Sequence, residues 1–163
     1  HPFQFNLFAL IKSNQDRKVQ QEDKFPSQMS PTITNSKQAL GRWGEEQAAQ
    51  FLAAKGYAIL ARNNRTPFGE IDLIAQQDAS LVFVEVKSRS SAEFGFPEEA
   101  VTPAKQQHIL ESAQTYLQEH PEFDGDWRVD VIAISRTQDG EPEIHHFENA
   151  FLKPNLIVII GPT

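Results

Sequence analysis

The segment GEIDLIAQQDASLVFVEVKSR, residues 69–89, has the composition of two apolar β-strands joined by a polar turn at residues 78–79. Val, Ile, Leu and Phe dominate both strands, yet the charged residues Asp72, Glu85 and Lys87 interrupt them. Charged side chains are rarely buried without a partner. These three residues are therefore the first candidates for a functional site.

The two strands are expected to form a hairpin with its charges on one face. Side chains alternate between the faces of a strand. The charged face carries Glu70, Asp72 and Ile74 on the first strand and Leu81, Phe83, Glu85 and Lys87 on the second. A hairpin around residues 78–79 places Asp72 opposite Glu85, where the two carboxylates repel each other and cost stability. A divalent cation between them would reverse the sign of that cost.

These two acids have the chemistry of a magnesium site. Mg²⁺ takes oxygen ligands, commonly one or two carboxylates, while waters and a substrate phosphate complete its shell. Such an ion can polarise a phosphodiester and activate a water. Lys87 lies on the same face as Glu85 and could position that water or stabilise charge on the phosphate. A Glu-x-Lys pair at a strand end is also typical of a solvated exit from the core, so the pattern alone leaves both interpretations open.

The flanking sequence predicts an α/β fold. Periodicity and strand composition mark helices at residues 40–55 and 102–117 and strands at 57–65, at 69–89 and at 127–135, with a shorter segment at 143–151. Glu45 lies at the edge of the apolar stripe of the first helix and faces the body of the fold. Thr102 is the expected N-cap of the second helix, and Pro103 its first residue. This order of elements favours layers of helices on a mixed sheet.

Length and composition limit the functional classes. A chain of 163 residues fits one domain. The absence of cysteine excludes disulfides, thiolate zinc sites and cysteine nucleophiles. The formal net charge of -7 argues against a broadly basic protein that coats nucleic acid, although a local basic patch can coexist with it. No segment reaches the ~20 apolar residues that a membrane span requires, so a soluble, cytoplasmic protein is expected.

Three regions are expected along the chain. Residues 1–36 form an N-terminal extension, which is expected to be flexible because its polar composition cannot bury enough apolar surface to offset the entropy of ordering. Residues 37–151 hold the folded domain, and residues 152–163 form a C-terminal extension. The two extensions are candidates for binding a protein partner.

Seven sequence blocks resemble the bacterial YraN-like proteins. In order along residues 41–151, they are GRWGEEQAAQFLAAKGYAILARNNR, GEIDLIA, LVFVEVKSR, FGFPEEAV, the helix that contains Lys105, WRVDVIAI and HHFENAF. The YraN-like proteins are an uncharacterised family of the restriction-endonuclease-like superfamily, which includes archaeal Holliday junction resolvases and is marked by a PD-(D/E)-x-K nuclease motif. The resemblance implies a restriction-endonuclease-like α/β domain over residues 37–151, whose mixed central sheet is flanked by helices and holds a metal site at one end of the central hairpin.

The resemblance also implies roles for individual residues. The acids and the lysine of the motif correspond to Asp72, Glu85 and Lys87, with isoleucine in place of the motif's proline, and the acid of the first helix corresponds to Glu45. Asp72, Glu85 and the backbone carbonyl of Val86 would bind Mg²⁺ or Mn²⁺. The implied catalytic set is Glu45, Asp72, Glu85 and Lys87.

Two further acids are ambiguous at the level of sequence. Glu70 could bind metal or pair with Lys87, which the hairpin register places opposite it, and pairing is favoured. Asp130 could form an ion pair with Arg128 or belong to the site. The sequence does not decide between these two roles for Asp130.

The predicted function is metal-dependent hydrolysis of phosphodiester bonds in branched or otherwise structured DNA. Arg65, Arg89 and Lys105 are candidates for phosphate contacts, which fix position without reading bases, although each could equally be an ordinary surface charge. Similarity to junction resolvases favours a homodimer. The alternative is a DNA-binding or adaptor domain that keeps the nuclease fold without appreciable turnover.

Overall fold

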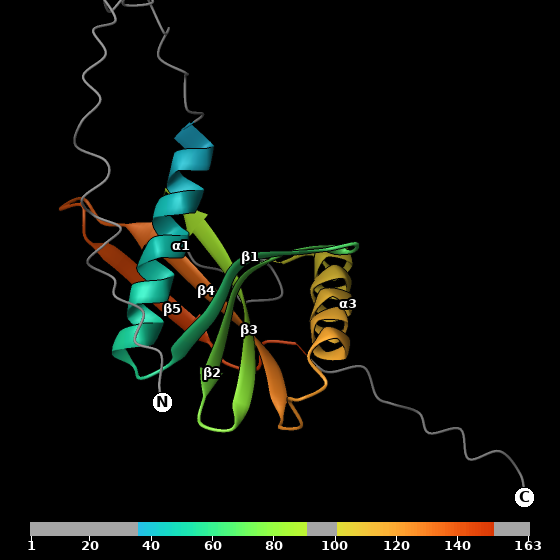
Figure 1. Cartoon of the computed structure of the whole chain (residues 1–163). Coiled ribbons are helices and arrows are strands. Elements are labelled where there is room, and N and C mark those ends of the chain that lie inside the picture. The colour runs from blue at the N-terminus through green and yellow to red at the C-terminus, as the bar shows by residue number, and fades with distance from the viewer. Residues whose placement is uncertain (1–35, 91–100, 152–163) are drawn as a thin grey trace, which may run out of the picture. The chain divides into compact units, whose positions relative to one another are not determined.

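The computed structural model describes residues 36–90 and 101–151, which form two helices and five strands. Their bounds are α1 Ser36–Ala54, β1 Ala58–Thr66, β2 Gly69–Gln77, β3 Ser80–Arg89, α3 Pro103–Glu119, β4 Trp127–Arg136 and β5 Pro142–Phe147 (Figure 1). The predicted C-terminal extension, and the N-terminal extension apart from Ser36, lie outside the described residues. Within the described parts of the chain, neither helix is long and apolar enough to cross a membrane.

The strands form one mixed sheet in the order β1-β2-β3-β4-β5. β1, β2 and β3 pair antiparallel, β3 and β4 pair parallel, and β5 pairs antiparallel with β4. The parallel pair needs a long connection, and α3 lies within it. The predicted α/β class with a mixed central sheet is therefore confirmed.

The β2–β3 hairpin has the predicted register. Its pairs run from Gln77 with Ser80 to Leu73 with Val84. The turn between the strands has two residues, and the first of them, Asp78, has a φ of 51°. Two-residue hairpin turns favour such left-handed conformations because their twist matches that of the strands.

The β2–β3 ladder ends at Leu73 and Val84, and beyond this pair the two strands separate. β2 continues toward residue 69 paired only with β1, whereas β3 continues toward residue 89 paired with β4. We call the opening between residues 69–72 and residues 85–89 the fork. The predicted ladder pairing of Asp72 with Glu85 is thus replaced by an open site between the strands.

The two helices cover opposite faces of the sheet. Ala48, Ala49 and Leu52 of α1 pack with Val84 and Ile132 in one buried cluster. The second cluster lies on the opposite face of the sheet. In it, Ile109, Leu110 and Ala113 of α3 pack with Phe83 of β3 and Val131 of β4. Each fully buried Val, Leu, Ile or Phe side chain stabilises the folded state by about 1.5–3 kcal/mol. The two clusters therefore fix the part of the sheet next to the fork.

Strict alternation along β2 fails at the fork. Leu73 packs in the α1 cluster, as alternation predicts, but Ile71 packs with Ile74 in the α3 cluster. The expectation that Glu70, Asp72 and Ile74 share one face is therefore wrong. The reason is that β2 leaves β3 here and follows β1 toward α3, as Figure 1 shows for the β1–β2 hairpin.

Local sequence signals explain the placement of both helices. The Thr102 side chain accepts a hydrogen bond from the backbone N–H of Lys105, and Pro103 is the first residue of α3, as predicted. Gly44 of α1 is buried against β3, where a Cβ atom would overlap Oγ of Ser88. Close contact between α1 and β3 therefore depends on a residue without a side chain.

Candidate active site

Asp72 caps the fork by replacing a backbone acceptor. If the ladder continued, the backbone of Val86 would pair with that of Ile71; instead, the Val86 N–H donates to Oδ2 of Asp72 over 2.7 Å. The N–H and C=O of a strand residue point to the same side. The carbonyl of Val86, a predicted metal ligand, thus faces the fork with the Asp72 carboxylate.

Glu85 is the most deeply buried acid of the predicted site, with 4% of its surface exposed. Its Oε1 lies 3.4 Å from Nζ of Lys87 and 3.7 Å from Nζ of Lys105. Its Oε2 is buried and has no hydrogen-bond partner. An unsatisfied carboxylate oxygen is costly in a protein interior, and a cation is the group that would satisfy it.

Burial, followed by the charge of Glu85, raises the pKa of Asp72 to about 7. The hydrogen bond from Val86 and the charge of Lys105 lower the pKa but do not compensate. Asp72 is therefore partly protonated near neutral pH unless a positive charge joins it. The geometry and the shifted pKa both indicate a carboxylate pair whose negative charge the two nearby lysines offset only in part: Oε2 of Glu85 has no partner, and the pKa of Asp72 stays raised.

Glu45 reaches the same region from α1. Its Oε2 accepts a hydrogen bond from Nδ2 of Asn63 over 3.0 Å, and Asn63 also donates to Oε1 of Glu70 over 3.3 Å. Burial, followed by the charges of Glu70 and Glu85, raises the pKa of Glu45. Asn63 was not among the residues predicted from the sequence, because its contact with Glu45 joins β1 to α1 and follows no local pattern. Its backbone has a left-handed φ of 48°, which asparagine tolerates better than most residues.

Glu70 does not pair with Lys87 as favoured from the sequence. Its Oε2 accepts a hydrogen bond from Nε of Arg65 over 3.3 Å, whereas Lys87 pairs with Glu85 on its own strand. The prediction was wrong because the hairpin register does not extend past the fork: Glu70 remains opposite Arg65 on β1. Arg65, a predicted phosphate contact, is nevertheless accessible, with 88% of its side chain exposed.

The acids open into a cavity of about 240 Å³ between α1 and the fork. Its lining residues are Lys37, Leu40, Gly41, Glu45, Asp72, Glu85, Val86, Lys87 and Ser88. One water needs only ~10–15 Å³ of such space, so the cavity has room for a hydrated ion beside one phosphate group. A larger hollow of about 550 Å³ adjoins it at Lys37 and Leu40, but no carboxylate lines that hollow among the described residues.

The donor set fits a hard divalent ion that keeps part of its own shell. Within residues 36–90 and 101–151, no cluster of three or more His, Cys, Asp or Glu side chains is arranged to hold a metal ion. Two carboxylates and one carbonyl, with water and phosphate completing the shell, are instead the usual environment of Mg²⁺. The unpartnered oxygen of Glu85 supports this fit.

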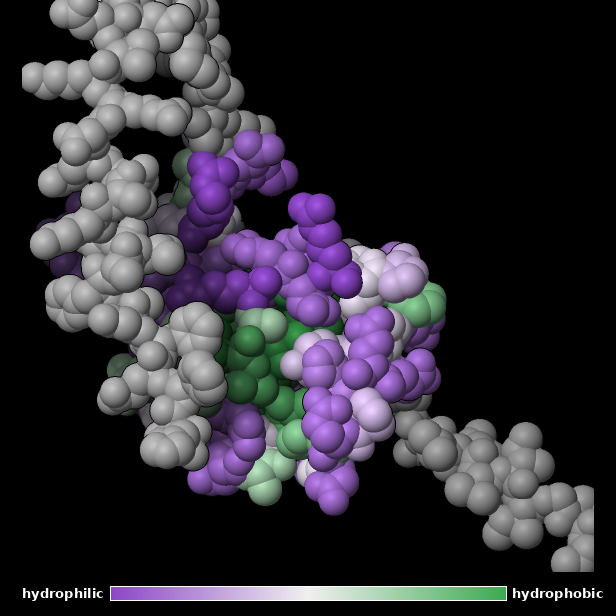
Figure 2. Space-filling model, viewed as in Figure 1, coloured by the Kyte–Doolittle hydropathy of each residue, from purple (hydrophilic) through white to green (hydrophobic). Residues whose placement is uncertain are grey.

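The predicted cationic residues lie at different places around the fork. Lys105 belongs to the site itself through its contact with Glu85. Arg89 is the last residue of β3, where it is partly exposed beside Ser135 of β4. Figure 2 shows hydrophilic side chains gathered over the N-terminal half of α1 and along the β1–β2 hairpin.

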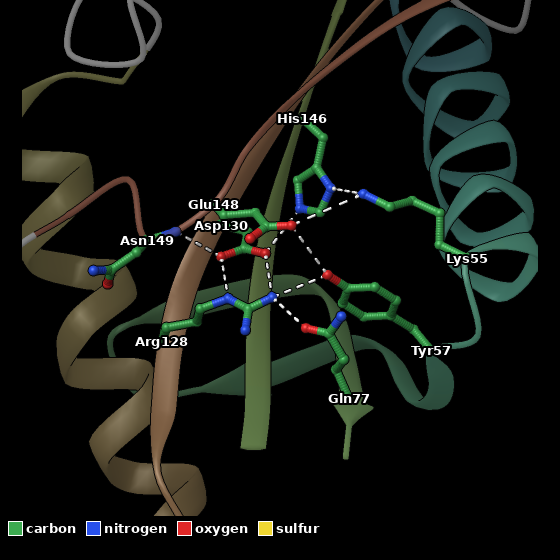
Figure 3. Close-up of polar contacts among 8 residues, drawn as sticks. All are labelled: Lys55, Tyr57, Gln77, Arg128, Asp130, His146, Glu148 and Asn149. Carbon is green, nitrogen blue, oxygen red and sulfur yellow. Dashed lines mark hydrogen bonds and ion pairs between the residues drawn. The ribbon is translucent and has the colours of Figure 1, made fainter. Parts of the chain in front are cut away.

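Asp130 belongs to a second polar cluster and not to the site. It is fully buried, accepts hydrogen bonds from Nε of Arg128 over 2.9 Å and from the N–H of Asn149 over 2.9 Å, and contacts Nε2 of His146 at 2.8 Å. The cluster drawn in Figure 3 comprises Lys55, Tyr57, Gln77, Arg128, Asp130, His146, Glu148 and Asn149. The ion-pair interpretation of Asp130 is therefore correct, and hydrogen bonds to His146 and Arg128 hold its pKa low against the effect of burial.

Comparison with known proteins identifies relatives over the same residues. The sequence profile of a family described as "Uncharacterised protein family UPF0102" matches residues 44–134. The UPF0102 protein of Syntrophomonas wolfei is 50% identical over 112 residues, which cover 69% of this chain and 96% of that protein. The UPF0102 protein of Syntrophotalea carbinolica is 48% identical over 119 residues, or 73% and 96% of the two chains. The predicted membership of the YraN-like proteins is confirmed.

One further relative and one solved structure complete the comparison. The UPF0102 protein of Thermus thermophilus is 56% identical over 77 residues, which cover 47% of this chain and 69% of that protein. The structure of Pyrococcus furiosus SfsA in complex with Ca²⁺ matches 69% of this chain and 63% of that chain, with 12% sequence identity and a TM-score of 0.37.

Proposed function

The chain belongs to the uncharacterised protein family UPF0102, and from this membership and the geometry of the fork we propose that it is a metal-dependent nuclease. Its substrate would be DNA of branched or otherwise structured form, and its reaction the hydrolysis of a phosphodiester bond. The observation that carries the proposal is the buried Oε2 of Glu85, which lacks a partner beside the Asp72 carboxylate.

The residues at the fork would have two roles in hydrolysis, metal binding and stabilisation of negative charge on the phosphate. Asp72, Glu85 and the Val86 carbonyl would hold Mg²⁺ or Mn²⁺, which supplies Lewis-acid polarisation of the phosphate and activation of a water. The water oxygen would bond to phosphorus while one ester P–O bond breaks, and the proton that the water loses balances the one that the departing alkoxide takes up. Lys87 and Lys105, both within 4 Å of Glu85, can place positive charge beside the phosphate oxygens as negative charge develops.

Glu45 belongs to α1, lines the cavity together with the acids of the fork and has a raised pKa. A carboxyl at the cavity wall whose pKa is raised above its usual value can exchange a proton with water near the reacting phosphate. Its hydrogen bond from Asn63 keeps one oxygen in place. We therefore assign Glu45 a supporting role in proton transfer.

A DNA-binding or adaptor domain without turnover is the second candidate. The observation that favours it is that Lys87 and Lys105 already lie beside Oε1 of Glu85. The two ammonium groups offset the buried charge, so the fold does not require a metal for its stability. Such a site could bind a phosphate through the lysines alone.

Cleavage assays on structured DNA test the two candidates. The full chain is incubated with four-way junction, flap and linear DNA in Mg²⁺ or Mn²⁺, alongside Asp72→Ala and Lys87→Ala. The nuclease proposal expects metal-dependent products from wild type and at least a 100-fold loss with either variant, a typical effect of removing a group that stabilises the transition state.

A matched pair of variants on α1 provides the control. Glu45→Gln removes the acid that faces the cavity, whereas Glu46→Gln removes its neighbour, which bonds Arg62 and Gln50 at the surface. Only Glu45→Gln should slow cleavage. If no substrate is cleaved, or if wild type and the site variants cleave equally, the nuclease proposal is rejected in favour of the binding domain.

A further inference from the structure

The β1–β2 hairpin presents an aromatic residue to solvent at its outer end. Phe68 has 45% of its surface exposed and, with Leu60 at 47%, is one of two exposed large hydrophobic residues in the described parts of the chain. It lies in the connection between β1 and β2, and Figure 1 shows this hairpin leaving the sheet and extending past α3. The hairpin thus carries Phe68 outward from the strand that holds Asp72.

The turn that carries Phe68 is fixed by hydrogen bonds. Oγ1 of Thr66 donates to the carbonyl of Gly69 over 3.0 Å and accepts from the N–H of Phe68 over 3.1 Å. The same oxygen lies 2.7 Å from Oγ of Ser112, a buried residue of α3. Gly69 has a φ of 140°, which a residue with a side chain rarely adopts. Phe68 is therefore held in solvent by a turn anchored to a helix.

We propose that Phe68 stacks on an unpaired base of a DNA strand whose phosphate lies at the fork. The inference rests on the proposed function and specifies its substrate: DNA that is single-stranded beside the bond to be cleaved. Every base offers an aromatic face, so an exposed phenyl ring binds unpaired bases without reading sequence. In a continuous duplex, neighbouring bases occupy both faces, and no face is available to Phe68.

The spacing between Phe68 and Asp72 suits this arrangement. Four residues of extended strand span about 13 Å at ~3.3 Å each. A base step rises ~3.4 Å in a duplex, so Phe68 lies within about four nucleotides of the phosphate at Asp72. A strand that runs along the hairpin can contact both residues.

Charge along the hairpin also favours a nucleic acid. Arg65 lies next to the turn with 88% of its side chain exposed, and its contact with Glu70 is a surface ion pair. Surface ion pairs contribute little stability, so the guanidinium can exchange Glu70 for a phosphate at small cost. A cation beside an aromatic ring is the usual composition of a single-strand binding groove.

A second copy of the chain fits Phe68 less well. A stable protein interface buries ~800 Å² on each partner. Phe68 is a single half-exposed side chain flanked by polar residues such as Thr66 and Arg65. We therefore assign the turn to a base and not to a partner protomer.

Binding measured in chelator tests the inference separately from cleavage. The probe is a DNA flap with 2-aminopurine placed in turn at each of the six positions nearest the branch on its single-stranded arm. Wild type should change the 2-aminopurine fluorescence at one or two positions. Phe68→Ala should abolish that change and raise Kd by about five-fold or more, which is the smallest effect expected when one stacked base is lost. Phe68→Trp, which keeps an aromatic face, should bind as wild type does.

Leu60→Ala is the matched control because it removes an equally exposed apolar side chain from the same hairpin. It should leave Kd and the fluorescence change as in wild type. The inference is overturned if Phe68→Ala binds like wild type, if Leu60→Ala weakens binding equally, if wild type does not bind the flap, or if sedimentation shows that Phe68→Ala dissociates an oligomer. A Phe68 effect on binding without cleavage in Mg²⁺ would reject the nuclease proposal while supporting the stacking inference.

Discussion

Asp72 combines a structural and an electrostatic role in one carboxylate. Its Oδ2 accepts a hydrogen bond from the Val86 N–H, which has no partner in the β2–β3 ladder. This oxygen thus replaces the backbone carbonyl that a continued ladder would supply. The carboxylate is also buried close to the charge of Glu85, which makes its ionised form unfavourable. At this residue, the local hydrogen bond stabilises the fold while the negative charge destabilises it.

The raised pKa of Asp72 predicts a pH-dependent stability. The unfolded chain ionises Asp72 near pH 3.8, whereas the folded chain retains the proton up to about pH 7. At Asp72 the unfolded state therefore binds fewer protons in this range, and the contribution of this residue lowers the free energy of unfolding as pH rises from about 4 to 7. Thermal melts in chelator across this range measure the contribution when compared with a variant that lacks the titrating group.

Asp72→Asn is that variant, since asparagine can still accept the hydrogen bond from Val86. At pH 8 in chelator it should be about 1–3 kcal/mol more stable than wild type, because the charge beside Glu85 is gone. At pH 4.5 the difference should largely disappear, because Asp72 is then protonated in the folded protein. An equal difference at both pH values would show that the charge of Asp72 is not the cause.

Divalent cations should stabilise the wild-type protein through the same two acids. At ten times its Kd, an ion that binds only the folded state raises the free energy of unfolding by about 1.4 kcal/mol. Calorimetry in Mg²⁺, Mn²⁺ and chelator should show a higher Tm for wild type with either metal. Glu85→Gln and Asp72→Asn should lose this increase, and a persistent increase in both variants would place the ion elsewhere.

At the scale of elements, the distance between α1 and β3 sets the width of the site. Glu45 projects from α1, and its neighbour Gly44 contacts Ser88, which follows Lys87 on β3. The contact is close enough that a single added methyl group cannot be accommodated without movement. The position of the helix-borne acid therefore depends on packing one residue away from it.

Two glycines of α1 provide a matched test of this contact. Gly44→Ala should destabilise the fold by about 1–3 kcal/mol, because the new methyl group overlaps Ser88. Gly41→Ala should be neutral or slightly stabilising, because no atom lies within 4 Å of a Cβ at Gly41 and alanine favours the helix. Urea denaturation measures both, and Ser88→Gly should partly rescue Gly44→Ala. Equal effects of the two alanines would contradict the packing argument.

At the scale of the whole domain, two polar clusters lie at different positions along α1. Glu45 marks the site, and Lys55, just past the helix, contacts His146 of the second cluster at 3.1 Å. Ten helical residues span about 15 Å, so the clusters are separate. As Figure 3 shows, the second cluster joins side chains from β2, β4 and β5 to the end of α1, which indicates a structural role.

Asp130→Ala should therefore affect stability and not the response to metal. The substitution leaves Arg128 without its buried partner, and breaking such a pair typically costs about 3–5 kcal/mol. Urea denaturation should show this loss, while the Tm increase in Mg²⁺ should remain as in wild type. A lost metal response in a still folded Asp130→Ala protein would show that the two clusters are coupled.

Much of this architecture was accessible from local patterns. The β2–β3 register follows from two-residue alternation and a two-residue turn, and the start of α3 follows from Thr102 and Pro103. Glu85 and Lys87 were placed together correctly because they lie on one regular strand. These features depend on residues near one another in the chain, where backbone geometry alone fixes the relation.

The sequence by itself determined the chemical groups of the candidate site, which are acids and a lysine at strand positions where apolar residues are expected. It also determined the α/β class, through the order of its blocks and their resemblance to one family. Only the tertiary structure decided which groups meet. It moved Glu70 to Arg65, brought Asn63 to Glu45 and Lys105 to Glu85, and assigned Asp130 to a separate cluster. The physical reason is the fork. Where β2 leaves β3, strand alternation no longer predicts which way a side chain points, and packing against α1 and α3 determines it instead.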